Sequence, residues 1–348
     1  MSFLRNVWYA AAWGTEVNAG ELFQRTLLNE PVVFFRDTQG TAQAIADRCP
    51  HRFAPLGMGT LKGDSVRCPY HGLEFDGSGT CMHNPHGDGA IPKAAKVKAY
   101  PLVERHSLLW IWMGDAGLAD ATLIPDFSCM DEDLWYVGKR YLHARANYVL
   151  ETDNIMDLSH IEFLHPSTLG GDGVKSALTS VQEEGNTVWS NRQTVAEIMP
   201  EFLYAAWNIP QGTPVDRWID VRWDAPANML LFSGAVATGL PREQGVSTPI
   251  PHLFTPETEA TTHYWFSVCF PKAMGEFAER FADEQAAAIN QPFADEDLPM
   301  LEAQQRMMGD ASFWDLKPVL LIGDAGAIRA RRVLDRLIAA EQPVGAKG

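Results

Sequence analysis

The chain has 348 residues, of which 46% are hydrophobic, and 44 acidic against 28 basic side chains give a formal net charge of −16. This length suits two domains, and the acidic excess disfavours nucleic acid and anionic lipid as partners. No stretch approaches the ~20 uninterrupted apolar residues of a membrane span, and the N-terminal residues lack the pattern of a signal peptide. We therefore expect a cytoplasmic protein without nucleic-acid or membrane partners.

The cysteines are distributed as metal ligands rather than as a disulfide framework. Five occur, which is an odd number, and two of them stand close to a histidine, in Cys49-Pro50-His51 and Cys68-Pro69-Tyr70-His71. This use of cysteine is typical of a reducing compartment. We interpret the other three cysteines as packed thiols.

The first third of the chain has the pattern of an all-β domain. Residues 31–36 and 42–46 are apolar or β-branched runs, and Asp-Thr-Gln-Gly at 37–40 between them predicts a turn. Residues 100–103 and 108–113 read as two further strands. The cysteine–histidine pairs fall on loops between such strands. We therefore expect an all-β region from residue 1 to about 115, with two ligand loops at its hairpin tips.

The two ligand loops allow two interpretations, a zinc site or an iron–sulfur cluster. A zinc site usually takes two sulfurs from one knuckle, whereas here each loop supplies one cysteine and one histidine. That arrangement suits a cluster with sulfur ligands on one iron and imidazoles on the other. Gly72 permits close backbone approach, and prolines 50 and 69 stiffen both loops. We favour the cluster over zinc.

The remainder of the chain combines strands with helices. Residues 114–125 are interpreted as a linker, and 166–185, rich in Gly, Ser, Thr and Asp, as a mobile loop over a pocket. Alternating runs between 187 and 270 predict an antiparallel sheet, with helices flanking it. The predicted helices are 150–163, 277–308 with interruptions near prolines 292 and 299, and 325–340.

A second group of metal-binding side chains lies about a hundred residues after the first. His160 and His165 would point about 140° apart on an undistorted helix, too far to share an ion. Pro166 disfavours α geometry at the residue before it, so the helix should end near Phe163 and His165 should bind from the exit segment. Asp157 lies three residues before His160, on the same helix face, and is expected to accept a hydrogen bond from a ligand histidine.

Two histidines and one carboxylate with open positions are typical of non-haem Fe(II) oxygenases. The third ligand must come from elsewhere in the chain. Asp153 and Asp157 are near in sequence, but the run at 295–297 is the better source, because Pro299 disturbs helical bonding there. An acidic run is also often just a solvated face, so spacing alone leaves Asp297 undecided.

These residues resemble the Rieske non-haem iron oxygenases, and within them the vanillate and dicamba O-demethylase group. The similarity covers nearly the whole chain, and the segment at 293–302 is similar to the one that brings the third ligand, which assigns Asp297. Residues 5–9, 255–259 and 330–334 carry the similarity to the subgroup. The two metal motifs are Cys49-Pro-His-Arg with Cys68-Pro-Tyr-His-Gly, and Asn154-x-x-Asp157-x-x-His160-x4-His165.

The resemblance implies an α+β chain, with an all-β Rieske [2Fe–2S] domain at 1–115 and a helix-grip catalytic domain at 116–348. It implies that four side chains hold the cluster, three hold a mononuclear Fe(II), and two, Asn154 and Asp157, serve catalysis. Dioxygen would be the co-substrate. The expected cluster ligands are Cys49, His51, Cys68 and His71, and the expected iron ligands are His160, His165 and Asp297.

The resemblance also implies partners. NADH would supply electrons through a separate flavin and iron–sulfur reductase, with or without a ferredoxin. The chain would form a head-to-tail homotrimer, in which Asp157 connects the cluster of one subunit to the iron of its neighbour.

In this group the carbon attacked is the methyl of an aryl ether, so we predict oxidative O-demethylation of a small aromatic substrate to a phenol and formaldehyde. N-dealkylation of an aromatic amide or anilide, or hydroxylation of an aryl methyl group, is the alternative. His252 is similar to a position that contacts substrate in dicamba-type enzymes. Leu231 stands where that type has Asn, which leaves the polar group of the substrate unassigned.

Two hypotheses from other classes compete with this one. A pure electron carrier would use the cluster alone, and a zinc-stabilised binding protein would hold neither iron centre. A visible absorption spectrum separates the zinc protein from the other two, because a Rieske cluster is coloured. Metal analysis of His165→Ala separates the oxygenase from the carrier.

Overall fold

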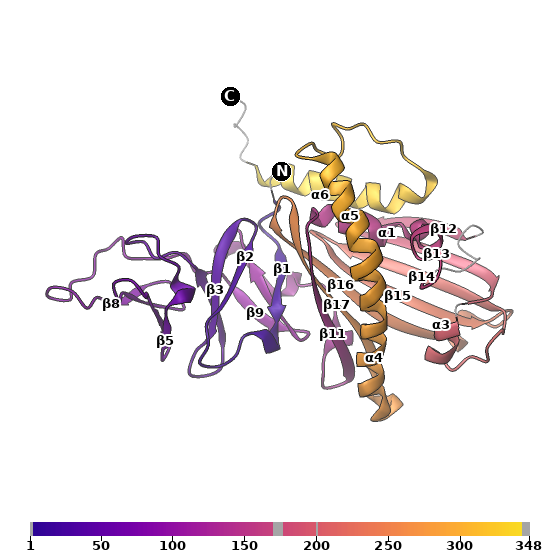
Figure 1. Ribbon diagram of the computed structural model, residues 1–348, viewed down its shortest axis with the longest axis horizontal. Helices are drawn as coiled ribbons and strands as arrows, with labels where there is room; N and C mark the ends of the chain where they lie inside the picture. Colours follow the sequence, from indigo (N-terminus) through magenta and orange to yellow (C-terminus); the bar gives the residue numbers. More distant parts are fainter. Residues whose placement is uncertain (1–2, 170–176, 200, 343–348) are drawn as a thin grey trace. The chain divides into compact units, whose positions relative to one another are not determined.

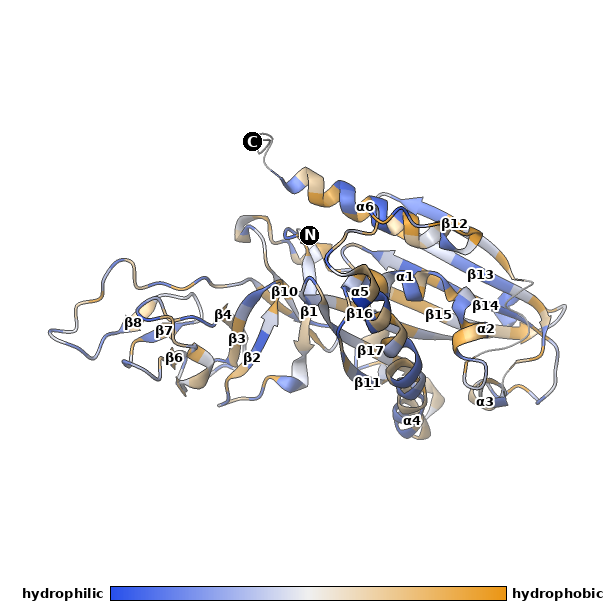
Figure 2. Cartoon of the chain, turned by 45° about the horizontal axis from the view of Figure 1, so that its top comes forward, coloured by the Kyte–Doolittle hydropathy of each residue, from blue (hydrophilic) through white to orange (hydrophobic). Residues whose placement is uncertain are grey.

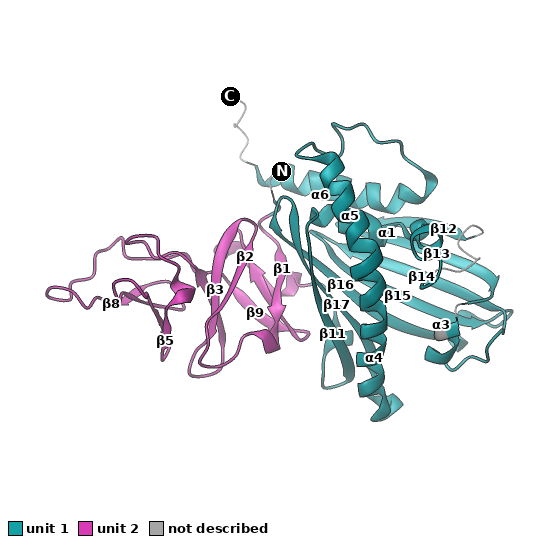
Figure 3. Cartoon of the chain, in the orientation of Figure 1, with its two compact units in different colours: residues 1–4, 125–348 teal, residues 5–124 magenta. Residues whose placement is uncertain are grey.

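The computed structural model describes residues 3–169, 177–199 and 201–342. The chain forms two compact units (Figures 1 and 3). One unit is Arg5–Ile124, and the other combines Met1–Leu4 with Pro125–Gly348.

The structural division follows Ile124, whereas the sequence places the domain boundary at 115/116. Residues after Gly114 remain with the first unit because their backbone is bonded to it. The carbonyl oxygen of Asp120 accepts a hydrogen bond from Nε1 of Trp8 at 2.8 Å. The carbonyl oxygen of Ala121 accepts one from Nη1 of Arg105, also at 2.8 Å.

The unit Arg5–Ile124 is built from small antiparallel sheets, as its short apolar runs and turn residues predict. The predicted strand at 42–46 is confirmed with the same bounds, and the one at 31–36 begins one residue earlier. The sheets are β1-β10-β9 (Trp8–Trp13, Leu108–Trp112, Leu102–Arg105), β2-β3-β4 (Phe23–Leu27, Glu30–Arg36, Ala42–Ala46) and β5-β6-β7-β8 (Thr60–Lys62, Ser65–Arg67, Glu74–Asp76, Cys81–His83).

The second unit contains one seven-stranded antiparallel sheet in the order β11-β17-β16-β15-β14-β13-β12. Directly opposite residues share a face, and the register Arg217↔Ala235 links the pair Thr194↔Arg217 to the pair Leu231↔Ile250, because Ala235 and Leu231 are four residues apart on one strand. These side chains therefore lie on one face. The strands are β11 (Trp135–Ala144), β12 (Leu178–Glu184), β13 (Thr187–Glu197), β14 (Val215–Asp224), β15 (Asn228–Ala237), β16 (Val246–Thr258) and β17 (Thr261–Pro271).

The long helices cover that same face, here called the inner face (Figure 1). Helix α4 (Phe277–Pro292) lies on β11 and β17. Its approach requires Gly138, because a Cβ there would stand 2.1 Å from the carbonyl oxygen of Ala282. Helix α6 (Ala325–Glu341) lies on β12 and β13 and interleaves hydrophilic with hydrophobic residues, as a helix with one covered side does (Figure 2).

The predicted helix at 150–163 is wrong in one respect, because it is broken at Asp157. Helix α1 (Tyr148–Met156) ends there, and Asp157 takes extended angles, φ −119° and ψ 96°. Its carboxylate accepts hydrogen bonds from the amide and the hydroxyl of Ser159, both at 2.9 Å. Such local bonds compete with helix continuation. A 3-10 turn (Leu158–His160) and α2 (Ile161–Leu164) follow, so the helix does end before His165.

The predicted helix at 277–308 is interrupted by a π-helical segment, Phe293–Asp297. It lies between α4 and α5 (Leu298–Met308), where prolines 292 and 299 stand. Pro299 has no N–H to donate to residue 295, which removes one α-helical bond at this point. The expected interruption is therefore confirmed, and it takes the form that often marks functional sites in helices.

The predicted loop at 166–185 is shorter than expected, because β12 begins at Leu178. Residues 170–176 of that predicted loop lie outside the described residues. Short α3 (Glu201–Ala206) follows β13.

Candidate functional site

The two cysteine–histidine loops have the same backbone design. In one, the amide of Phe53 donates to the carbonyl oxygen of Cys49 at 2.9 Å; in the other, Gly72 donates to Cys68 at 3.1 Å. The residue four positions after each cysteine has positive φ, +61° at Phe53 and +75° at Gly72. Both loops thus reverse direction within four residues of the cysteine, and Gly72 supplies its reversal without the strain of a Cβ.

The four side chains separate into a buried sulfur pair and an outer imidazole pair. Cys49 and Cys68 are buried in the core of the first unit. Burial raises the pKa of the Cys49 thiol to about 11, together with a hydrogen bond and charge from Cys68. The rings of His51 and His71 stand 4.5 Å apart and reach the surface.

A third histidine, which the sequence did not single out, supports this site. His86 lies on the loop after β8, and its Nε2 is 2.8 Å from the carbonyl oxygen of His71. Its ring centroid is 6.2 Å from that of His71. The spacing of fifteen residues carries no recognisable pattern, so only the structure reveals this contact.

The second candidate site brings together His160, His165 and Asp297, whose ligand atoms lie within 4.8 Å of one another. Oδ1 of Asp297 is 3.1 Å from Nε2 of His165 and 3.5 Å from Nε2 of His160. His165 and Asp297 are buried. The histidines come from the turns after α1 and α2, and Asp297 is the last residue of the π segment.

Both histidines are oriented through their Nδ1 atoms. Nδ1 of His160 lies 2.8 Å from the carbonyl oxygen of Asp157, and Nδ1 of His165 contacts the Glu296 carboxylate. These oxygens accept, so Nδ1 carries the proton and Nε2 keeps its lone pair for a metal. The expected contact between Asp157 and His160 exists, but the carbonyl makes it rather than the carboxylate. Glu296 is a contributor that the sequence did not assign.

The charges around this site favour a cation. Burial opposes the charged form of His165, but hydrogen bonds and charges from Asp297 and Glu296 outweigh it and raise the pKa of this imidazole. Burial lowers the pKa of His160 and so favours the neutral form that binds metals. Nδ2 of Asn154 donates to Oδ1 of Asp297 at 2.9 Å and fixes that carboxylate. The donor set of two imidazoles and one carboxylate fits Fe(II).

The two groups differ in how tightly they converge. Across the described ranges, His160, His165 and Asp297 are the only His, Cys, Asp or Glu side chains that form such a compact trio. The two cysteines and two histidines of the first site do not form such a compact group, which suits a two-iron cluster better than a single zinc ion.

A cavity of about 100 Å³ adjoins the trio on the inner face of the sheet. Both residues predicted to face substrate, His252 and Leu231, line it together with all three members of the trio. Its other lining residues are mostly apolar, as a site for a small aromatic molecule requires. They include Ile155, Leu158, Ile161, Leu203, Ile219, Ile250, Ile289 and Phe293.

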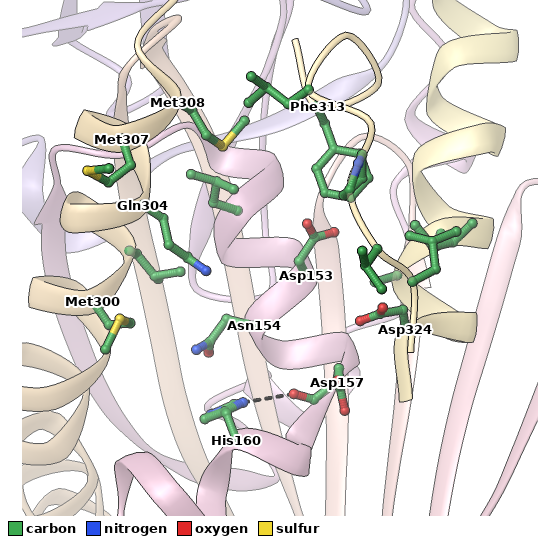
Figure 4. Close-up of a pocket in the computed structure, with 18 of the residues that line it drawn as sticks. Asp153, Asn154, Asp157, His160, Met300, Gln304, Met307, Met308, Phe313 and Asp324 are labelled. Atoms are coloured by element: carbon green, nitrogen blue, oxygen red, sulfur yellow. Dashed lines mark hydrogen bonds between the residues drawn. The ribbon is translucent and has the colours of Figure 1, made fainter. Parts of the chain in front are cut away.

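A second cavity, of about 460 Å³, lies on the other side of α1 and is also lined by Asn154 and His160. Figure 4 shows Asn154 and His160 on the side of α1 toward α5, which contributes Met300, Gln304, Met307 and Met308, and it shows Asp153 and Asp157 on the side toward Asp324. Asn154 and His160 thus form a common wall between the two cavities.

Comparison with known proteins identifies the family. The Rieske [2Fe-2S] domain model matches residues 7–101, and the Vanillate O-demethylase oxygenase C-terminal domain model matches residues 144–340. The chain is 39% identical to the chloroacetanilide N-alkylformylase oxygenase component of Rhizorhabdus wittichii, over 97% of both chains. It is 38% identical to the dicamba O-demethylase oxygenase component of Stenotrophomonas maltophilia, over 97% of this chain and 98% of that one.

This chain belongs to the Rieske non-haem iron oxygenases. A solved structure of dicamba monooxygenase bound to 3,6-dichlorosalicylic acid superposes with a TM-score of 0.88 at 35% identity, covering 98% of this chain and 99% of that one. The predicted fold, an all-β Rieske domain plus a sheet-and-helix catalytic domain, is confirmed. The electron-carrier and zinc hypotheses are wrong, because the match at 144–340 is to an oxygenase domain.

As a Rieske oxygenase component, the chain uses a [2Fe–2S] cluster and a mononuclear Fe(II), with O2 as co-substrate. A separate reductase delivers the electrons of NADH to this oxygenase. Within the described part of this oxygenase, no helix is both long and apolar enough to cross a membrane.

Proposed function

We propose that this oxygenase oxidises an alkyl carbon of a small aromatic substrate, and that the reaction is O-demethylation to a phenol and formaldehyde. The observation that carries the proposal is the position of the His160, His165 and Asp297 trio at the wall of a small apolar cavity. The relative named for dicamba O-demethylation supports this reaction. The relative named as a chloroacetanilide N-alkylformylase supports N-dealkylation as the second candidate.

We assign the cluster to Cys49, His51, Cys68 and His71. The buried sulfurs and surface imidazoles support this, because the outer iron would then exchange electrons through rings that reach solvent. The contact of His86 with the carbonyl oxygen of His71 steadies the second loop.

We assign the mononuclear iron to His160, His165 and Asp297. When bound there, Fe(II) supplies the activation of dioxygen that the protein side chains lack. The chain's own residues fix the geometry: Asn154 holds Asp297, and the Asp157 carbonyl and Glu296 hold the two imidazoles. The apolar cavity wall excludes water from the carbon that reacts.

We propose that His252 and Leu231 contact the substrate. Burial lowers the pKa of His252 to about 3, so this imidazole is neutral. Its Nδ1 lies 2.7 Å from the hydroxyl of Tyr264, and its Nε2 has no hydrogen-bond partner among the described residues. A substrate oxygen would complete the hydrogen bonding of His252, while Leu231 adds apolar wall.

We further propose that the oxygenase is a head-to-tail homotrimer in which Asp157 connects a neighbour's cluster to the iron. The bond between the backbone carbonyl of Asp157 and the ring of His160 places this residue beside the iron site, and the partial exposure of its carboxylate side chain, 19%, makes that carboxylate the group that we assign to the contact with the neighbour. The reductase acts alone or through a ferredoxin. Because none of the five cysteines forms a disulfide, we place the protein in the cytoplasm.

The test is a substrate screen with the holoenzyme, NADH and a surrogate reductase, scored for formaldehyde. Methoxybenzoates, chloroacetanilides and toluene sulfonates are the three arms. Formaldehyde from a methoxybenzoate supports O-demethylation, and aldehyde only from an anilide supports N-dealkylation. Conversion of a toluene sulfonate to an alcohol without formaldehyde supports methyl hydroxylation. Inactivity on every arm would contradict the proposal, provided that the cluster is reduced.

A further inference from the structure

Arg217 is a cation in the wall of the 100 Å³ cavity that the proposed chemistry does not use. It lies on β14, on the inner face of the sheet, and its side chain is 11% exposed. Among the described residues that line this cavity, it is the only Lys or Arg. A charged group in such a position is costly unless it is paired or serves a ligand.

The sequence provides one partner for Arg217 through a local irregularity of β13. The pairing of β13 with β14 is regular as far as Thr194↔Arg217 and then shifts, so that Glu197 pairs with Val215. Ala196, inside this bulge, has φ +54°, which a residue with a Cβ rarely adopts. Regular alternation would turn Thr194 and Glu197 to opposite faces, and the bulge instead lets both be buried beside Arg217.

Glu197 holds one edge of the guanidinium. Its Oε1 accepts a hydrogen bond from Nη1 of Arg217 at 3.1 Å, and its Oε2 accepts one from the hydroxyl of Thr194. Nε of Arg217 is buried and has no hydrogen-bond partner among the described residues. A guanidinium carries five N–H donors in a planar fork, so the contact with Glu197 leaves donating capacity unused. Strained backbone and unpaired donors together are typical of ligand sites.

We propose that Arg217 binds an oxyanion on the aromatic ring of the substrate, a carboxylate or a sulfonate. The proposal rests on the function proposed above and adds the substrate class. A planar fork of charged donors matches the oxygens of such a group, whereas a neutral amide offers one acceptor and brings its own N–H donors. The other residues of the cavity that we assign to substrate are a neutral imidazole, His252, and an apolar one, Leu231. Neither residue carries a positive charge that would select an anion. Arg217 is therefore the residue that distinguishes an anionic from a neutral substrate.

Glu197 then acts as a positioning residue. It fixes the plane of the guanidinium through Nη1, and Thr194 fixes Glu197 in turn. The charges of Arg217 and Glu197 nearly cancel. Selection of an anionic substrate therefore depends on the direction of the guanidinium N–H donors as well as on the positive charge of Arg217.

The test measures binding without turnover, by titration calorimetry on the oxidised holoenzyme. The probes are benzoate, benzenesulfonate and benzamide, none of which has an alkyl carbon to oxidise. We expect both anions to bind about tenfold more tightly than benzamide, as for a charge-assisted hydrogen bond. The double variant Arg217→Gln/Glu197→Gln keeps a neutral hydrogen-bonded pair and should bind all three alike. Arg217→Lys should keep part of the preference, because it keeps the charge but not the fork.

Arg222→Gln is the matched control. Arg222 is on the same strand but the opposite face, is paired with Asp224 at 2.7 Å, and should leave the preference intact. Equal binding of benzoate and benzamide by the wild type overturns the proposal. A double variant that still prefers anions also overturns it, and if that variant loses the cluster absorbance, Arg217→Lys decides instead. Formaldehyde release tests dealkylation separately. A preference for anions without release of formaldehyde would contradict the proposed O-demethylation but not the role of Arg217.

Discussion

Glu296 should control how tightly the oxygenase holds its mononuclear iron. Its carboxylate accepts from Nδ1 of His165, and its Oε2 also accepts from the hydroxyl of Thr168 at 2.8 Å. Glu296→Gln keeps an acceptor but removes its charge. Hydrogen bonds to charged groups contribute about 1.5–3 kcal/mol and neutral ones about 0.5–1.5. The difference of about 1–1.5 kcal/mol corresponds to about tenfold weaker iron binding.

Glu296→Ala should cost more, because it leaves the buried Nδ1–H of His165 with no acceptor. We expect about 1.5–3 kcal/mol, or ten- to about a hundredfold in affinity. The assay is equilibrium competition between the protein and an iron chelator, with the visible absorbance of the cluster as an internal measure of protein. Asp295→Ala is the control, since Asp295 is in the same π segment, has the same charge and is exposed.

The reasoning is refuted if Glu296→Ala and Asp295→Ala hold iron equally well. Equal weakening by both would show that only the net charge of the segment matters. A loss of cluster absorbance in Glu296→Ala would show that the variant disturbs the whole chain rather than one imidazole.

Three further predictions test the electron path and the fold. Asp157→Asn should keep both metal centres, as measured by metal analysis and by the cluster spectrum, while reductase-driven turnover collapses. Normal turnover of this variant would contradict the proposed bridging role of Asp157. Gly138→Ala should lower the free energy of unfolding by about 1–3 kcal/mol in urea titration, because the new Cβ would meet the carbonyl oxygen of Ala282. Arg331→Gln should lower it by about 1.5–3 kcal/mol, because Nε of Arg331 contacts both carboxylate oxygens of Asp153 at 2.9 Å and this half-buried carboxylate would lose its charged donor. An unchanged urea midpoint would contradict this prediction.

Sequence pattern predicted those parts of the fold that local chemistry decides. Apolar alternation with turn residues located β3 and β4, and Pro166 correctly placed the end of the helix before His165. The helix break at Asp157 was not predicted from the sequence, because it depends on hydrogen bonds from Ser159 to the Asp157 carboxylate. An Asp in a helical pattern does not reveal which hydrogen bonds its side chain accepts.

The candidate site divides in the same way. Close spacing revealed the cysteine–histidine pairs and the two later histidines. Partners that meet only after folding were missed: His86 against His71, Glu296 against His165, and Arg217 in the cavity. The spacing around Arg217 looks like ordinary strand alternation, and the bulge that brings Glu197 to it depends on the register of two strands.

The π segment explains why the acidic run at 295–297 could not be resolved from the sequence. Two consecutive residues serve one imidazole there: Glu296 contacts Nδ1 of His165, and Asp297 contacts Nε2 at 3.1 Å. Consecutive side chains of a regular α-helix diverge by about 100°, and Asp295 turns to solvent. Prolines 292 and 299 loosen the helical register at this point, which lets the segment place both carboxylates around one ring. Strengthening α-helical bonding here should therefore separate Glu296 from His165 before it affects the rest of α4.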